Sequence, residues 1–305
     1  MSQTVWVTGV AGFTGRHLVA FLRQLPEPPR IVGLGLGAVD GVELDAHFPL
    51  DVTDPGQIEA AIAQERPDIV FHLAAVMPPC DDALLWHVNV GGTNNLLRAL
   101  AKAGCQQTRI LLVGSAAEYQ MREDGLLSED DPIAGETHYG QSKSAQIEWA
   151  RQIAGLFGLS LVVARPFNLI GPGLPERWVA AMLCAQFADP GTATITVGNT
   201  ASERDFVDVR DCVQAYWELA LKGTPGEAYN VCSNHPTGIG ELIDILQALT
   251  DGRHSVEVDR SRFRSVDLDR VYGTNHKIRE AIGWQPQISL KQSLLDMLDE
   301  HRDGE

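Results

Sequence analysis

The sequence is short of basic residues, and this shortage excludes two classes of partner. Its 305 residues include 24 Lys and Arg against 40 Asp and Glu, which gives a formal net charge of −16. A surface of that charge repels phosphate backbones and anionic lipids, so we expect no nucleic-acid partner and no membrane partner. An anionic metabolite is still compatible with it, because such a ligand needs only a local pocket of backbone N–H groups and a few arginines.

Cysteines and long apolar runs are also scarce. No run of about 18 apolar residues occurs, and the start of the chain has no basic signal-peptide region, so we predict a cytoplasmic protein without a membrane span. The cysteines show neither a CxxC pair nor a cluster with histidine, and we expect reduced, mostly buried thiols and no metal site. They are Cys80, Cys105, Cys184, Cys212 and Cys232.

The hydrophobic pattern indicates an α/β fold. Short runs rich in Val, Ile and Leu alternate with longer amphipathic segments through the first two thirds of the chain, which is typical of β-α-β units around a parallel sheet. We therefore predict a Rossmann-type doubly wound parallel sheet with a smaller C-terminal α/β substrate lobe. The expected strands are 5–8, 30–34, 69–73, 110–114 and 160–165, and the expected helices are 15–25, 55–64, 84–103 and 139–157.

The density of turn-forming residues changes after position 168. Gly and Pro cluster at 171–175 and again at 189–191, and the regular alternation of strand and helix is lost. We predict a dinucleotide-binding domain at 1–167, to which the chain returns around 205–232. The nucleotide-sugar-binding lobe is expected at 168–204 and 233–305.

The first expected strand runs directly into a glycine-rich turn and then a helix. Gly9 allows a tight turn, Gly12 lets a pyrophosphate approach the backbone, and Gly15 lets the helix pack closely on the sheet. The GxxGxxG spacing differs by one residue from the usual GxGxxG dinucleotide fingerprint. In this strand–turn–helix context it predicts a dinucleotide site.

The second expected strand bears on which dinucleotide is bound. A site that prefers NAD carries an acidic side chain about 20 residues after the glycine turn, to bind the ribose 2′-hydroxyl. Here no carboxylate follows that strand before Asp40. We predict NADP as cofactor, with NAD as the alternative. Arg16, which opens the glycine-loop helix, is the candidate partner of a 2′-phosphate. The alternative is that Arg16 is only an exposed residue of the first helical turn, with no role in binding.

A tyrosine and a lysine spaced for one helix face provide the strongest chemical signal. Tyr139 and Lys143 stand at i and i+4, so the ammonium group can lie near the phenol and lower its pKa from about 10 towards neutrality. Such a phenol can protonate a carbonyl oxygen while hydride arrives from nicotinamide. Ser115, at the end of an expected strand, would hydrogen-bond the same substrate oxygen.

These motifs together resemble the extended, nucleotide-sugar-modifying branch of the short-chain dehydrogenases/reductases, the NAD-dependent epimerase/dehydratase family. The segments 164–173, 202–209, 226–233 and 270–294 resemble GDP-4-keto-6-deoxymannose reductases, so the resemblance covers nearly the whole chain. RPFN at 165–168 and RDFVDV at 204–209 occur throughout the epimerases, dehydratases and reductases of this branch. They specify the branch better than the reaction.

The resemblance implies a set of site residues. Ser115, Tyr139 and Lys143 would be catalytic; Asn168 and Arg204 would hold a substrate diphosphate, and Arg264 and Asp267 the nucleoside end. Asn89 lies in the helix beneath the cofactor, where its amide would organise structure or touch ligand. The implied cofactor contacts are Gly9, Gly12, Phe13, Thr14, Gly15, Arg16, Asp51, Val52, Leu73, Ala74, Ala75, Asn89, Val113, Tyr139, Lys143 and Pro166.

The sequence also departs from relatives of this branch. Ala116 and Ala117 replace the Asp-Glu pair of hexose 4,6-dehydratases, which disfavours dehydration. Glu118 stands where the family commonly has Val, and we predict an exposed loop residue, with an added acid/base as the alternative. Cys80 is expected to be an inert loop thiol rather than a second acid/base. His138 replaces the usual Pro before the tyrosine.

The resemblance implies an NAD(P)-dependent oxidoreductase that reduces the C4 keto group of a nucleotide-linked deoxysugar. Two alternatives remain open: a nucleotide-sugar 4-epimerase with tightly bound NAD, and a non-catalytic dinucleotide-sensing or assembly subunit. The implied partners are a nucleotide-diphosphate sugar and a second copy of the chain in a homodimer.

Overall fold

The computed structural model describes residues 3–37, 39–252, 254–263 and 269–303. Its centre is a parallel sheet of seven strands in the order β12-β7-β5-β4-β1-β2-β3. The order reverses beside β1, as in a doubly wound sheet, which confirms the predicted fold class. The strands are β1 (Thr4–Thr8), β2 (Arg30–Gly35), β3 (Ala46–Pro49), β4 (Ile69–His72), β5 (Arg109–Val113), β7 (Ser160–Pro166) and β12 (Ala228–Val231).

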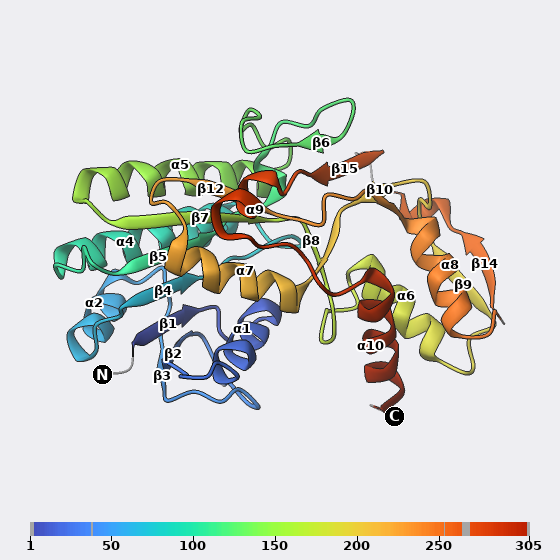
Figure 1. The fold of residues 1–305 in the computed structure, drawn as a ribbon, viewed down its shortest axis with the longest axis horizontal. Helices are drawn as coiled ribbons and strands as arrows, with labels where there is room; N and C mark the ends of the chain where they lie inside the picture. The colour runs from blue at the N-terminus through green and yellow to red at the C-terminus, as the bar shows by residue number, and fades with distance from the viewer. Residues whose placement is uncertain (1–2, 38, 253, 264–268, 304–305) are drawn as a thin grey trace.

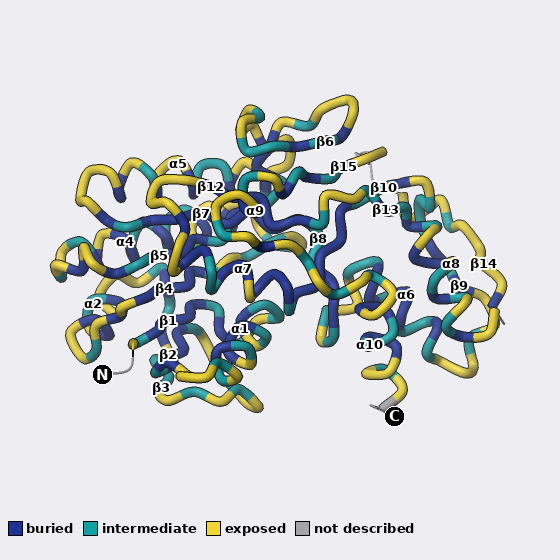
Figure 2. The backbone as a smooth tube through the Cα atoms, viewed as in Figure 1, coloured by how far each residue is buried: buried dark blue, intermediate teal, exposed yellow. Residues whose placement is uncertain are grey.

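Helices cover both faces of this sheet (Figures 1 and 2). One face packs against α1 (Phe13–Arg23), α7 (Val209–Lys222) and α9 (His276–Ile282). The other face packs against α2 (Pro55–Gln64), α4 (Thr93–Lys102) and α5 (His138–Phe157). Central strands are therefore buried on both sides, which explains their uninterrupted apolar sequence.

The sequence prediction of one helix over 84–103 is wrong in detail. The structure has α3 (Asp82–Leu85), then a wider π-helical segment, η1 (Trp86–Gly92), and only then α4. Gly91 and Gly92 lower the α-helical propensity at this point. Gly92 also has no room for a side chain, since a Cβ atom there would lie 2.7 Å from the Val52 side chain. The wider segment brings Asn89 into the protein interior.

A smaller lobe lies at one end of the sheet, on the right of Figure 1. Its apolar core joins α6 (Val179–Ala188), α8 (Ile239–Leu249) and α10 (Leu290–Asp303). Three small sheets complete it: β13-β10-β15-β6, β11-β8 and β14-β9. Their bounds are β6 (Leu126–Leu127), β8 (Asn168–Ile170), β9 (Thr194–Val197), β10 (Glu203–Arg204), β11 (Phe206–Asp208), β13 (Thr237–Gly238), β14 (Ser255–Val258) and β15 (Arg270–Gly273); two 3₁₀ turns are η2 (Ala116–Glu118) and η3 (Arg260–Arg262).

The chain thus crosses between sheet and lobe more than once. After β8 it enters the lobe, and it returns through α7 and β12 to the large sheet. Four cysteines are buried and Cys80 is half-buried. Among the described residues, no helix is long and apolar enough to cross a membrane.

Candidate functional site

The glycine turn after β1 forms a tight cradle that leaves little room for side chains. Gly9 has φ +68°, a conformation that favours glycine, and a Cβ atom there would lie 2.9 Å from the Ala74 backbone nitrogen. Gly12 begins α1 with no side-chain cap. A Cβ atom at Gly15 would meet the Gly9 carbonyl oxygen at 2.6 Å. The helix N-terminus is therefore packed against the turn, as a pyrophosphate site requires.

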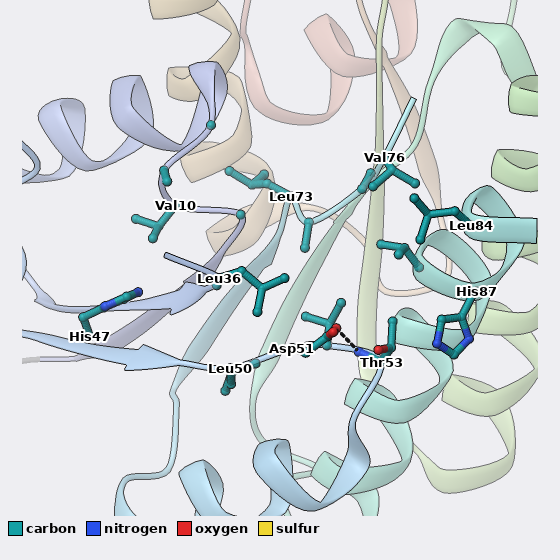
Figure 3. Close-up of a pocket in the computed structure, with 18 residues that line it drawn as sticks. Val10, Leu36, His47, Leu50, Asp51, Thr53, Leu73, Val76, Leu84 and His87 are labelled. Atoms are coloured by element: carbon teal, nitrogen blue, oxygen red, sulfur yellow. Dashed lines mark hydrogen bonds between the residues drawn. The ribbon is translucent and has the colours of Figure 1, made fainter. Parts of the chain in front are cut away.

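A cavity of about 540 Å³ opens beside this cradle, where β1, β2 and β4 end (Figure 3). Val10 and His47 lie on one side of it, and Leu84 and His87 on the opposite side. The predicted cofactor residues that line it are Gly9, Gly12, Asp51, Val52, Leu73, Ala74 and Ala75. The cavity lies at the reversal of strand order, which is where open α/β sheets bind ligands.

The cavity also has a wall that the motifs did not indicate. Leu36, Thr53, Val76, Leu84 and His87 line it, and all come from segments without a recognisable binding motif. Phe13, Thr14, Arg16, Asn89, Val113 and Pro166 are not among its lining residues. Leu36 directly follows β2, and its side chain is 71% exposed. An apolar residue therefore stands at the edge where an NAD site would carry its acid.

Arg16 is fixed at the same edge of the site. Its Nε donates to the carbonyl oxygen of Ala11 at 3.0 Å, and its Nη1 donates to that of Asp40 at 2.8 Å. These two bonds tie the first turn of α1 to the loop after β2. The guanidinium group is exposed and held next to the cradle, where it can meet a phosphate.

A buried histidine holds the loop that follows β4. Leu73 and Ala74 donate their backbone N–H groups to Thr8 Oγ1, whose hydroxyl lies 2.8 Å from His72 Nδ1. His72 Nε2 lies 2.9 Å from Thr93 Oγ1, whose hydroxyl donates to the Asn89 carbonyl. These partners require the neutral tautomer with hydrogen on Nε2. Burial, with the Lys143 charge, lowers the pKa of His72 to about 3.

Asn89 connects that loop to the helix of the catalytic candidates. Its Oδ1 accepts from the Val76 N–H at 2.9 Å, and its Nδ2 donates to Val76 O and Ser142 Oγ at 3.1 Å each. Ser142 in turn donates to the Tyr139 carbonyl. Asn89 is fully buried, so its amide organises the site.

The fold brings Ser115, Tyr139 and Lys143 together from two elements. Ser115 caps η2 directly after β5, while Tyr139 and Lys143 lie in the first turns of α5, which Thr137 caps. The side chains of Ser115 and Tyr139 hydrogen-bond to each other. Lys143 Nζ donates to the Val113 carbonyl oxygen at 2.7 Å, so its ammonium group is held at the end of β5.

The expectation of a lowered phenol pKa is wrong for this structure. Burial raises the pKa of Tyr139 to about 12, with the Ser115 hydrogen bond opposing the shift. Burial lowers the pKa of Lys143 to about 8, against the charge of Glu118. The Lys143 ammonium group bonds to a backbone carbonyl and does not stabilise a phenolate. The Tyr139 phenol is therefore protonated at pH 7.

The prediction of an exposed Glu118 is also wrong. Its side chain is fully buried, and Arg165 Nε donates to it at 2.7 Å. The Ser115 N–H donates to its other oxygen at 2.6 Å. The sequence signal was present in the spacing of the Ser115–Glu118 capping box, which satisfies backbone N–H groups at the start of η2.

The remaining candidates have the following places. Asn168 Nδ2 donates to the Asp205 carbonyl oxygen, and Arg204 Nη1 to that of Glu203. Arg264 and Asp267 lie outside the described residues. His138 forms an ion pair with Asp82 of α3. Cys80 lies in the loop before α3, and no group of three or more His, Cys, Asp or Glu in the described part of the chain could hold a metal ion.

Comparison with known proteins places this arrangement in a family. Residues 5–232 match the NAD dependent epimerase/dehydratase family. The chain is 32% identical to the GDP-6-deoxy-D-mannose reductase of Pseudomonas aeruginosa, with 98% of this chain and 97% of that protein covered. It is 27% identical to the GDP-6-deoxy-D-talose 4-dehydrogenase of Aggregatibacter actinomycetemcomitans, again with 98% and 97% covered.

A solved structure supports the same assignment. RMD from Pseudomonas aeruginosa, complexed with NADPH, superposes with a TM-score of 0.86 at 31% identity, with 99% of this chain and 100% of that chain covered. The sequence resemblance to the extended short-chain dehydrogenases/reductases is thereby confirmed. The glycine cradle, the cavity and the Ser115, Tyr139 and Lys143 group therefore belong to a member of the NAD dependent epimerase/dehydratase family.

Proposed function

We propose that the protein reduces the C4 keto group of a nucleotide-linked deoxysugar with NADPH. The observation that carries this proposal is the meeting of Ser115, Tyr139 and Lys143 at the end of β5, in a sheet whose glycine cradle fits a dinucleotide. The relatives named as a GDP-6-deoxy-D-mannose reductase and a GDP-6-deoxy-D-talose 4-dehydrogenase support the substrate class. A nicotinamide dinucleotide held by the glycine cradle would supply the hydride for the carbonyl carbon.

The protein side chains supply the proton and the orientation. Tyr139 gives its phenolic proton to the substrate oxygen, and Ser115 hydrogen-bonds the same oxygen. Lys143, fixed on the Val113 carbonyl, would bind the nicotinamide ribose. The raised pKa of Tyr139 suits this direction, because a reductase needs a protonated phenol before the reaction.

NADP is the proposed cofactor, and NAD is the alternative. Leu36 offers no carboxylate for a ribose 2′-hydroxyl, and the exposed Arg16 stands at the same edge with free access to a phosphate. The Pseudomonas aeruginosa structure complexed with NADPH supports this choice. The predicted contacts from Phe13, Thr14, Asn89, Val113 and Pro166 remain proposals.

The lobe is proposed to bind the nucleotide-diphosphate sugar. Asn168 of β8 stands where the chain enters the lobe, and Arg204 of β10 stands shortly before it returns through α7. Arg204 suits a diphosphate because its guanidinium can bond two oxygens at once. We propose the division into 1–167, 168–204 and 233–305 on this role, with α9 of the last segment packed on the large sheet. Arg264 and Asp267 are proposed for the nucleoside end from sequence resemblance alone.

The 4-epimerase with bound NAD is the second candidate function. It uses the same three side chains but begins by removing a proton from a hydroxyl group, and a phenol with a pKa of about 12 has almost none of the basic phenolate form at pH 7. A non-catalytic dinucleotide sensor is a third candidate, and the intact group of Ser115, Tyr139 and Lys143 argues against it.

The fate of the cofactor tests reductase against epimerase. A reductase releases oxidised cofactor in each cycle, so the purified protein should carry little nicotinamide and consume one NADPH for each product molecule. We would denature the protein, measure released nicotinamide by chromatography, and follow NADPH absorbance with a panel of nucleotide 4-keto sugars. About one NAD per chain, with two nucleotide sugars interconverted and no net NADPH loss, would assign the epimerase.

We further propose a homodimer formed through α5. Trp149, Leu156 and Phe157 of this helix are 52%, 75% and 37% exposed, which leaves large apolar side chains in water on a helix that covers the sheet. Trp149→Glu should convert a dimer to a monomer in sedimentation; a wild-type monomer would contradict the proposal. The cytoplasmic location is proposed from the sequence and is tested by cell fractionation.

A further inference from the structure

A buried ion pair lies directly behind the catalytic serine. The side chains of Glu118 and Arg165 are 0% and 2% exposed, and they are joined by a bond of 2.7 Å. Glu118 comes from η2 and Arg165 from β7. Burying two charges costs free energy that hydrophobic residues of the same size avoid, so such a pair has a specific role in many sites.

The pair fixes the backbone on which Ser115 stands. Glu118 Oε1 accepts the Ser115 N–H at 2.6 Å, and Ser115 Oγ accepts the Ala117 N–H at 3.1 Å. The carboxylate also occupies the space beside Gly114, where a Cβ atom would lie 2.2 Å from Glu118 Oε1. The end of β5 is thus built around this carboxylate.

The guanidinium end of the pair is anchored on the far side. Arg165 Nη1 bonds to the Tyr119 hydroxyl at 3.1 Å, and the guanidinium stacks over the Tyr119 ring at 4.9 Å. Tyr119 donates to Asn230 Oδ1 of β12 at 2.6 Å. Because each member has a partner, Glu118 cannot turn away from Ser115 without leaving a buried charge unpaired.

The Glu118 charge also acts on the other two catalytic side chains. For Lys143, burial lowers the pKa and the Glu118 charge partly offsets this by raising it. For Tyr139, burial and the Glu118 charge both raise the pKa. The other titratable groups near them are His72 of β4, which is neutral, and Tyr216 of α7, whose hydroxyl is fully buried.

We propose that Glu118 is a positioning residue for the reaction: its carboxylate, anchored by Arg165, holds the Ser115 backbone N–H and so fixes the end of β5 where Ser115 and Lys143 meet. The proposal rests on the proposed function, because it assumes that the three side chains act on a keto sugar. Arg165 anchors the carboxylate and does not itself touch substrate. Without the negative charge of Glu118, Lys143 would lose its proton at a lower pH, and the site would then lose its cation.

Two variants remove the charge. Glu118→Gln keeps the shape of the side chain but leaves Arg165 unpaired, so its folding is checked by Tm. The double variant Glu118→Gln, Arg165→Gln removes both charges and keeps the measurement possible if the single variant does not fold. Asp208→Asn is the matched control, because Asp208 is an equally buried carboxylate that pairs with Arg210 at 2.8 Å.

Two readouts separate a positioning role from a purely structural one. The first is lysine side-chain NMR: the chain has only five lysines, and the signal missing in Lys143→Met identifies Lys143. We expect the titration of Lys143 near pH 8 to move down by about 0.5–1 pH unit in Glu118→Gln, and by less in the double variant, which also removes the positive charge of Arg165. The other four lysines and the Asp208→Asn control should not shift.

The second readout is the pH profile of turnover with NADPH. The apparent pKa of its alkaline limb should fall by the same amount as the Lys143 titration in each variant, while KM for NADPH stays within about twofold. Unchanged Lys143 titration and an unchanged alkaline limb in a folded variant would overturn the proposal. If wild-type protein reduces no keto sugar but the NMR shift is seen, the proposed function fails and the electrostatic role of Glu118 stands.

Discussion

Gly15→Ala tests the glycine cradle most directly. A Cβ atom at Gly15 would lie 2.6 Å from the Gly9 carbonyl oxygen, 2.7 Å from the Val10 carbonyl oxygen and 2.8 Å from Val10 Cα. Ordinary contact begins at 3.4 Å. All three obstacles are backbone atoms, so no side-chain rotation can relieve the overlap. Helix α1 and the turn must move apart.

The magnitude follows from this geometry. Overpacking of this kind costs about 1–3 kcal/mol, and Ala recovers about 1 kcal/mol of it through its higher helix propensity. We therefore expect a loss of up to about 2 kcal/mol in the free energy of unfolding. Moving the turn also misaligns backbone N–H groups with a pyrophosphate, and loss of one bond to a charged group lowers dinucleotide affinity by at least about tenfold.

Calorimetric titration with NADPH and urea unfolding measure the two effects. Gly155→Ala is the matched control, since Gly155 lies in α5 and a Cβ atom there meets nothing within 4 Å. The control should keep its NADPH affinity and gain up to about 1 kcal/mol of stability. If Gly15→Ala binds NADPH as tightly as wild type and is equally stable, the cradle does not depend on this close approach and our reasoning is refuted.

Three further predictions follow from the same site. Leu36→Asp should shift the ratio of NADP to NAD affinity towards NAD by at least about tenfold, because a carboxylate repels the 2′-phosphate, whereas Leu36→Asn should shift it less. His72→Gln should reduce the loss of stability in acid. The pKa of His72 is about 3 in the folded protein and about 6.5 in the unfolded chain, so the wild-type free energy of unfolding falls as pH drops through this range, by about 2 kcal/mol at pH 5. Urea unfolding at each pH measures this, and equal losses in both proteins would contradict it. Tyr139→Phe should lower turnover about 10²–10⁴-fold and leave NADPH affinity nearly intact; near-normal turnover would remove Tyr139 from the mechanism.

Local spacing explains what could be predicted from the sequence. The cradle depends on Gly9, Gly12 and Gly15, which follow one strand and begin one helix, so their roles follow from the backbone conformations that only glycine adopts or from close packing. Tyr139 and Lys143 share a helix face because four residues make about one helical turn. Such relations hold whatever surrounds the segment.

The incorrect predictions concern contacts across the fold. Glu118 occupies a loop position that is polar by sequence, and it is buried because Arg165, 47 positions later, lies opposite it. The phenol pKa of Tyr139 depends on how deeply α5 packs. The wider segment within 84–103 carries Asn89, which bonds to the loop after β4. None of these partners is adjacent in sequence.

The sequence by itself determined the parallel sheet, the cradle and the candidate catalytic side chains, because apolar periodicity and short-range spacing act within single elements. Only the tertiary structure decided the protonation states and the support of the site. The His72 bonds join Thr8, Thr93 and the loop after β4, and the Glu118 pair joins η2 to β7. Burial and long-range pairing set the pKa of a group, and both depend on how the whole chain packs.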